Sequence, residues 1–156
     1  MDYLLLKFVH ILSATILFGT GLGSALFMFM ANRRKNVHGI YLTARHVVTA
    51  DWLLTTPAVI IQLLTGMGLV SIGGYAFTDL WIMSGLTLYL FAGACWIPVV
   101  WMQIRMRDMA KLAHESGQSL PQRYWRMERW WTILGSLAFP AVVIVFYLMV
   151  FKPNHI

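Results

Sequence analysis

Four long apolar stretches follow one another along the chain, at about residues 3–31, 41–72, 79–103 and 124–151. A helix needs about 20 apolar residues to cross the hydrocarbon core of a bilayer, so each stretch can span a membrane with some tilt. The first stretch also exceeds the roughly 7–15 apolar residues of a signal peptide, which predicts a retained helix. The pattern predicts an all-α polytopic membrane protein, a bundle of four transmembrane helices that forms one domain over residues 1–156.

The composition agrees with this pattern, since 59% of the residues are hydrophobic and only 12% are charged. A chain of this kind has no room for a separate soluble domain. The single Cys95 excludes an intramolecular disulfide and any metal cluster built from cysteines.

The positive charges are concentrated in two connections of the predicted bundle. Ten of the 12 Lys and Arg residues lie in these connections or at the borders of the adjoining apolar stretches: Arg33, Arg34, Lys35, Arg45, Arg105, Arg107, Lys111, Arg123, Arg126 and Arg129. The connection SIGGYAFTD has no Lys or Arg, and each end of the chain carries one lysine. Charges that flank apolar spans indicate a membrane protein rather than a nucleic-acid partner. The positive-inside rule predicts cytoplasmic basic loops and both termini outside, which in a bacterial inner membrane means termini in the periplasm.

His10 lies within the first apolar stretch, about two turns into the predicted helix. Gly21 and Ser24 share its face at about 100° per residue, so the surface below the imidazole is formed by small side chains. A flat ligand fits against such a face. The G-x-x-x-G spacing of Gly19 and Gly23 is equally typical of close packing between two helices, and packing is the preferred interpretation of these glycines.

The second apolar stretch carries a polar stripe that is expected to point into the bundle. Five residues fall within about 40° of one direction on a helix of 3.6 residues per turn: Asp51, Thr55, Ala58, Gln62 and Thr65. Gln62 and Thr65 lie at about the depth of His10, which predicts a site in the outer leaflet formed by these three residues. The alternative interpretation is hydrogen bonding between helices without any ligand.

The other histidines are less informative. His46 lies near the cytoplasmic end of the second helix, so one subunit cannot place it and His10 on the same haem. Met67 or Met83 would then be candidates for the sixth iron ligand, and Met83, Thr87 and Tyr147 are candidates opposite His10. His38, His114 and His155 lie in loops or at the tail and are interpreted as solvated.

Three segments carry a resemblance to a known family: KFVHILSATILFGTGLGSALFMF, ADWLLTTPAVIIQLLTGMGL and RWWTILGSLAFPAVVIVFYLMVFKP. Through them, and nearly end to end, the chain resembles a bacterial family of predicted integral membrane proteins, domain of unknown function 2269. The resemblance implies a polytopic membrane protein and no particular activity.

The first helix is also distantly similar to those of HemJ-type protoporphyrinogen oxidases and CopD-like copper-resistance proteins. HemJ-type proteins bind b-type haem through a first-helix histidine, and His10 is the matching position. They also carry a lysine in the third helix, whereas the stretch from 80 to 103 here has no Lys or Arg. The resemblance therefore implies haem binding more directly than oxidase activity.

Three hypotheses follow. In the first, haem b is bound with His10 as iron ligand, Gly21 and Ser24 make room for it, and the role is redox. In the second, the chain is a small permease or metal-handling protein that uses Asp51, Gln62 and Thr65. In the third, it is a ligand-free membrane subunit that associates with a second copy or with another membrane protein; the lipid bilayer is its surroundings in all three.

Overall fold

The computed structural model describes residues 2–153 and contains helices and no strand within them. The elements are α1 (Tyr3–Arg34), α2 (Val37–Ala50), the π-helical segment η1 (Asp51–Thr55), α3 (Thr56–Ile72), α4 (Leu80–Ser116) and α5 (Gln122–Phe151). Because α2, η1 and α3 continue one another, the described chain forms four rods, all long and apolar enough to cross a membrane. The predicted fold class is therefore confirmed. His155 lies outside the described residues.

The ends of the helices follow from local chemistry. Lys35 adopts a left-handed conformation with φ 55° and ends α1, and the Asn36 side chain then accepts a hydrogen bond from the Gly39 N–H at 2.8 Å and caps α2. Helix α4 continues past residue 103, the end of its apolar stretch, because the residues that follow are good helix formers. It stops at Gly117, whose φ of 65° suits glycine.

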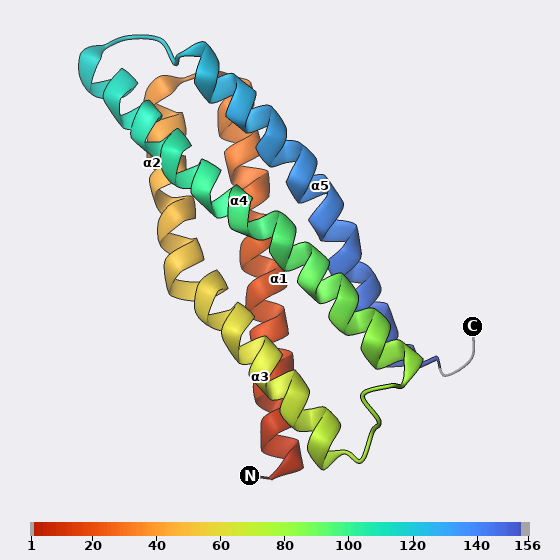
Figure 1. Ribbon diagram of the computed structural model, residues 1–156. Helices are drawn as coiled ribbons and strands as arrows, with labels where there is room; N and C mark the ends of the chain where they lie inside the picture. Colours follow the sequence, from red (N-terminus) through yellow and green to blue (C-terminus); the bar gives the residue numbers. More distant parts are fainter. Residues whose placement is uncertain (1, 154–156) are drawn as a thin grey trace.

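The rods are arranged as two pairs. Helix α1 packs mainly against α3, helix α4 mainly against α5, and α2 joins the pairs by packing against α4, whereas α1 and α5 share few contacts. Both basic connections lie at the same end of the bundle (Figure 1). The start of α1, the α3–α4 connection and the end of α5 lie at the other end.

The main hydrophobic cluster lies at the basic end, where α1, α2, α4 and α5 meet. Met28, Met102, Met106 and Met127 are buried in it, and small alanines of α2 and α4 let these two helices approach closely. Methionine is flexible and fills irregular space. The methionines of this cluster therefore act as core side chains.

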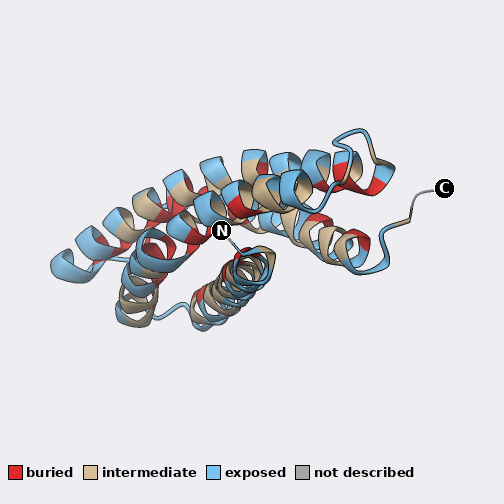
Figure 2. Ribbon diagram, turned by 90° about the horizontal axis from the view of Figure 1, so that it is seen from below, coloured by how far each residue is buried: buried red, intermediate tan, exposed pale blue. Residues whose placement is uncertain are grey.

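Apolar side chains cover the outside of the bundle as well. Leu53, Ile97 and Val150 are each more than 65% exposed, and Figure 2 shows exposed residues along the outward sides of the helices. An apolar surface of this extent is unfavourable in water and favourable in lipid. The bundle is thus built to be surrounded by a bilayer.

A buried hydrogen bond connects α1 and α5 at the basic end of the bundle. Tyr124 is 0% exposed, and its hydroxyl donates to Asn32 Oδ1 at 2.7 Å. The Asn32 amide is buried too, so its oxygen has no access to water if the tyrosine hydroxyl is removed.

We expect Tyr124→Phe to lower the free energy of unfolding by about 1 kcal/mol, because a buried acceptor loses its donor. Unfolding in mixed micelles with increasing sodium dodecyl sulfate measures this change. Tyr147→Phe is the matched control, since Tyr147 is 55% exposed and should change stability by less than about 0.5 kcal/mol. Equal stability losses in the two variants would contradict the prediction.

Candidate intramembrane sites

The polar stripe of the second span points into the bundle as the sequence predicts. Asp51, Thr55, Ala58 and Thr65 are buried, and Gln62 is partly buried. These residues nevertheless belong to two separate sites. Asp51 and Gln62 are 11 positions apart, which corresponds to about 16 Å along a helix at 1.5 Å per residue.

The π-helical segment η1 positions the first two residues of the stripe. Pro57 has no N–H and would clash with the carbonyl four residues earlier in a regular helix. The wider turn of η1, in which the Thr56 N–H bonds the Asp51 carbonyl, lies directly before this proline and relieves the clash. It leaves Asp51 and Thr55 buried, and the Thr55 hydroxyl donates to Asp51 Oδ1 at 3.0 Å.

The first site is a hydrogen-bonded cluster between α1 and α3. His10 Nδ1 lies 2.9 Å from Thr65 Oγ1, and His10 Nε2 lies 3.0 Å from Gln62 Nε2. Ser13 extends the cluster, because its hydroxyl donates to Gln62 Oε1 at 2.5 Å. The structure thus brings together the three residues predicted to meet in one leaflet.

The donors and acceptors of this cluster define the His10 tautomer. The Thr65 hydroxyl donates to the Ile61 carbonyl at 2.6 Å, so Thr65 Oγ1 accepts from an Nδ1–H of His10. The Gln62 amide nitrogen can only donate, so Nε2 of His10 is its acceptor. With the Gln62 amide in this orientation, these bonds favour a neutral His10 with its proton on Nδ1.

Glycines of α3, rather than those of α1, make room at this cluster. A Cβ at Gly66 would lie 3.2 Å from His10 Cε1, and one at Gly68 would lie 2.9 Å from Leu6 Cδ2. By contrast, Cβ atoms built at Gly19, Gly21 and Gly23 meet no atom within 4 Å. Within one chain, the expectation that Gly19 and Gly23 pack against another helix is therefore wrong.

The surroundings of His10 decide how well it suits haem. Nε2, the nitrogen that would bind iron, is occupied by the Gln62 amide, and His10 lines neither of the two cavities described below. The candidates for further ligands or contacts, Met67, Met83, Thr87 and Tyr147, are all exposed on outward faces. His46 is also exposed. In this conformation the residues present do not fit a haem on His10.

The second site is a cavity of about 510 Å³ between the two helix pairs. Gly21 and Ser24 line it from α1, Asp51 and Thr55 from η1, and further residues come from α3, α4 and α5. The predicted residues Gly21 and Ser24 therefore share a site with the Asp51 end of the polar stripe and not with His10.

Three buried polar atoms lie at this cavity without a hydrogen-bond partner among the described residues. They are Asp51 Oδ2, Gln103 Oε1 and Trp131 Nε1, and all three side chains line the cavity. The Gln103 side chain lies beside the Asp51 carboxyl. An unsatisfied buried polar group costs free energy, so a complementary polar group beside these three residues would be stabilising.

The remaining walls of the cavity are apolar and open. Gly21, Gly93 and Gly135 line it from three helices, and a Cβ at each would meet no atom within 4 Å. Phe18 and Phe139 lie with ring centroids 4.9 Å apart on its wall. Glycines at these places keep the space free that larger side chains would fill.

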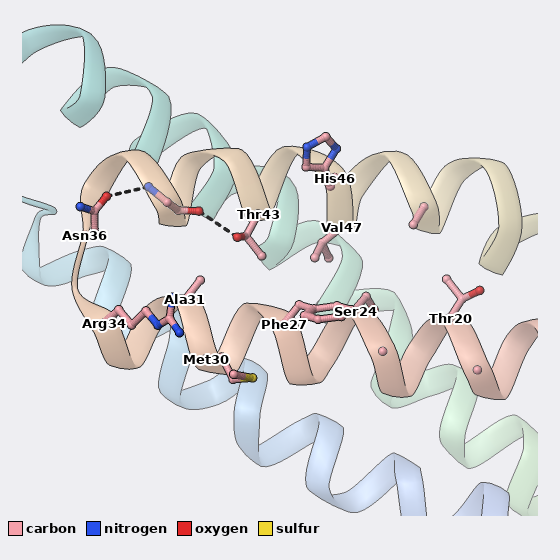
Figure 3. A pocket seen from close by; sticks show the side chains of 14 residues that line it. Thr20, Ser24, Phe27, Met30, Ala31, Arg34, Asn36, Thr43, His46 and Val47 are labelled. Carbon is pink, nitrogen blue, oxygen red and sulfur yellow. Dashed lines mark hydrogen bonds between the residues drawn. The ribbon is translucent and has the colours of Figure 1, made fainter.

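A groove of about 750 Å³ lies between α1 and α2 near the basic end. Figure 3 shows Thr43 and Val47 of α2 facing α1 across it, with Arg34 at the α1–α2 connection. The Thr43 hydroxyl donates to the Gly39 carbonyl at 2.8 Å. The Ser24 hydroxyl donates to the Gly21 carbonyl in the same way, at 3.2 Å, so both hydroxyl groups are satisfied by the backbone of their own helix.

Some residues of both sites were not identified from the sequence. Ser13 lies three positions after His10, a helical spacing that could have indicated it. Gln103 and Trp131 have no such signal, because they come from other helices whose rotation hydropathy does not define.

Together, the four apolar rods, their lipid-facing surface and the polar sites enclosed between them define an integral membrane protein with four spanning helices. The chain belongs to the family described as predicted integral membrane protein (DUF2269), whose sequence profile matches residues 4–153. Neither the curated proteins nor the solved structures provide a match to it.

The cluster around His10 predicts a neutral imidazole with an Nδ1-bound proton. Nitrogen NMR of histidine-labelled protein in micelles should show this tautomer, and Thr65→Val should change the Nδ1 signal because it removes the acceptor. His46 is exposed and provides the reference signal in the same sample. A haem absorption band that disappears in His10→Ala would contradict the closed cluster.

Proposed function

We propose that this protein is a small permease-type membrane protein that binds amphiphilic organic cations in the cavity at Asp51. The observation that supports this proposal is the buried carboxyl group of Asp51, which lines the cavity and whose Oδ2 has no hydrogen-bond partner in the described chain. Acidic groups within a membrane span are costly and are usually functional.

Charge complementarity supports a cationic head on the ligand. Asp51 is 4% exposed, and none of the described residues that line the cavity is Lys, Arg or His. A carboxylate in this position therefore lacks a positive partner within the cavity. A cationic group beside Oδ2 would compensate the charge, and the Trp131 indole ring can add a cation–π contact.

The shape of the cavity supports an apolar body behind that head. Its volume of about 510 Å³ lies within the range of roughly 300–1,000 Å³ typical of small-molecule sites. Phe18, Trp96 and Phe139 supply aromatic walls, and the glycines leave the space that a flat or branched apolar group needs. A ligand with an aromatic body and a cationic end matches both features.

The proposed site is tested with 4-phenylbutyltrimethylammonium and its uncharged tert-butyl isostere. In detergent micelles the wild-type protein should bind the cation at least tenfold more tightly than the isostere, a difference of about 1.4 kcal/mol. Asp51→Asn should abolish this preference because it removes the negative charge. Binding is measured by equilibrium dialysis of the labelled compounds.

Two further variants separate the effect of the Asp51 charge on binding from the effect of the cavity volume. Gly93→Leu should weaken binding of both compounds because it fills the cavity while leaving Asp51 in place. Gly19→Leu is the matched control, since it adds the same side chain at another open glycine that does not line this cavity. A cation preference that survives Asp51→Asn, or no saturable binding by the wild type, would contradict the proposal.

Haem binding by His10 is the second candidate, favoured by the unprotonated Nε2 of the imidazole, which is the nitrogen that would bind a metal. Ligation would require the Gln62 amide to turn away from Nε2. An absorption spectrum of the purified protein, oxidised and then reduced with dithionite, distinguishes the two candidates. A colourless protein after haem supplementation would remove this candidate and leave the first unaffected.

We further propose that the basic end of the bundle is cytoplasmic in a bacterial inner membrane. Both basic connections lie at one end (Figure 1), and positive charge near spans is retained on the cytoplasmic side. Alkaline phosphatase, which is active only outside the cytoplasm, should be active when fused after residue 153. The same fusion in the 117–121 connection should be inactive; the reverse pattern would contradict this orientation.

A further inference from the structure

Two histidines that are 76 positions apart in the sequence meet at the basic end of the bundle. His38 lies in the first turn of α2 and His114 in the last turn of α4. His38 Nδ1 is 3.3 Å from His114 Nε2, and the ring centroids are 4.6 Å apart. Both residues are exposed, so the pair is open to solutes in the water phase.

The separation of the two nitrogens matches a shared metal ion. Imidazole nitrogens bind Zn²⁺ at about 2.0–2.1 Å with tetrahedral angles, which places two ligand nitrogens about 3.3–3.4 Å apart. A direct hydrogen bond between the rings is the alternative explanation. At 3.3 Å such a bond is longer than the usual range of about 2.7–3.2 Å for N–H donors.

The packing of α2 against α4 places the two rings close together without a metal. Ile40 and Ala44 of α2 and Ala110 and Ala113 of α4 are all buried in the main hydrophobic cluster, which fixes the two helices close to the pair. The Tyr41 ring also stacks on His114, with centroids 5.6 Å apart and an interplanar angle of 23°. The two ligands are thus preorganised on packed helices rather than on loops.

We propose that His38 and His114 form a binding site for a first-row transition-metal ion such as Zn²⁺, with water completing the coordination. Imidazole favours such ions, whereas Mg²⁺ and Ca²⁺ require oxygen ligands. The site is independent of the Asp51 cavity, because neither histidine lines that cavity.

Zn²⁺ binding to tag-free protein in micelles tests the proposal, with a chromophoric zinc indicator as competitor. The wild type should bind one Zn²⁺ per chain, and His38→Ala and His114→Ala should each weaken binding at least tenfold. His46→Ala is the matched control: His46 is also exposed on α2, and its removal should change the affinity less than twofold. Mg²⁺ should not compete.

Thermal unfolding gives a second measurement that separates ligation from folding. Without metal, His38→Ala should unfold at the same temperature as the wild type, because the side chain is exposed. Zn²⁺ should raise the unfolding temperature of the wild type and of His46→Ala but not that of His38→Ala or His114→Ala. Absent Zn²⁺ binding, or equal binding by all four proteins, would overturn the site and leave a hydrogen-bonded histidine pair.

Discussion

A buried carboxyl group in the second span is the constraint on which this account depends. Asp51 lies on an inward face among apolar helices, and only one of its two oxygens has a hydrogen bond within the described chain, from the Thr55 hydroxyl. The π-helical turn before Pro57 accommodates the missing N–H of the proline and fixes both residues on that face. Asp51, Gln103 and Trp131 line one cavity, and each carries a buried polar atom without a hydrogen-bond partner among the described residues.

The packing of the bundle explains why there is space beside this group. At the basic end, α2 and α4 approach through small residues, methionines fill the remaining volume, and the bond from Tyr124 to Asn32 joins α5 to α1. Farther along, α1 and α5 share few contacts. Glycines of α1, α4 and α5 line the space between the pairs. The well-packed end and the open middle are therefore two distinct parts of the bundle.

The sequence predicts much of this arrangement, because hydropathy defines spans and depth. It predicts the four helices, the inward direction of the Asp51–Thr65 stripe and the contact of His10 with Gln62 and Thr65, all of which the structure contains. It does not predict that Gln103 and Trp131 line the same cavity as Asp51. Their helices have no clear amphipathic face, so the hydropathy pattern does not define which side of each helix points into the bundle. The pairing of His38 with His114 depends on the extension of α4 beyond the apolar stretch and on its register against α2, which no local pattern defines.

Uptake into proteoliposomes measures whether Asp51 recognises a cation inside the membrane. The probe is labelled 4-phenylbutyltrimethylammonium, whose permanent charge hinders its passage through lipid alone. The wild-type protein should accelerate uptake of this probe, and Asp51→Asn should reduce uptake to the level of protein-free vesicles. Equal uptake by the wild type and Asp51→Asn would contradict the account, because the buried carboxyl group would then have no part in recognising the cation.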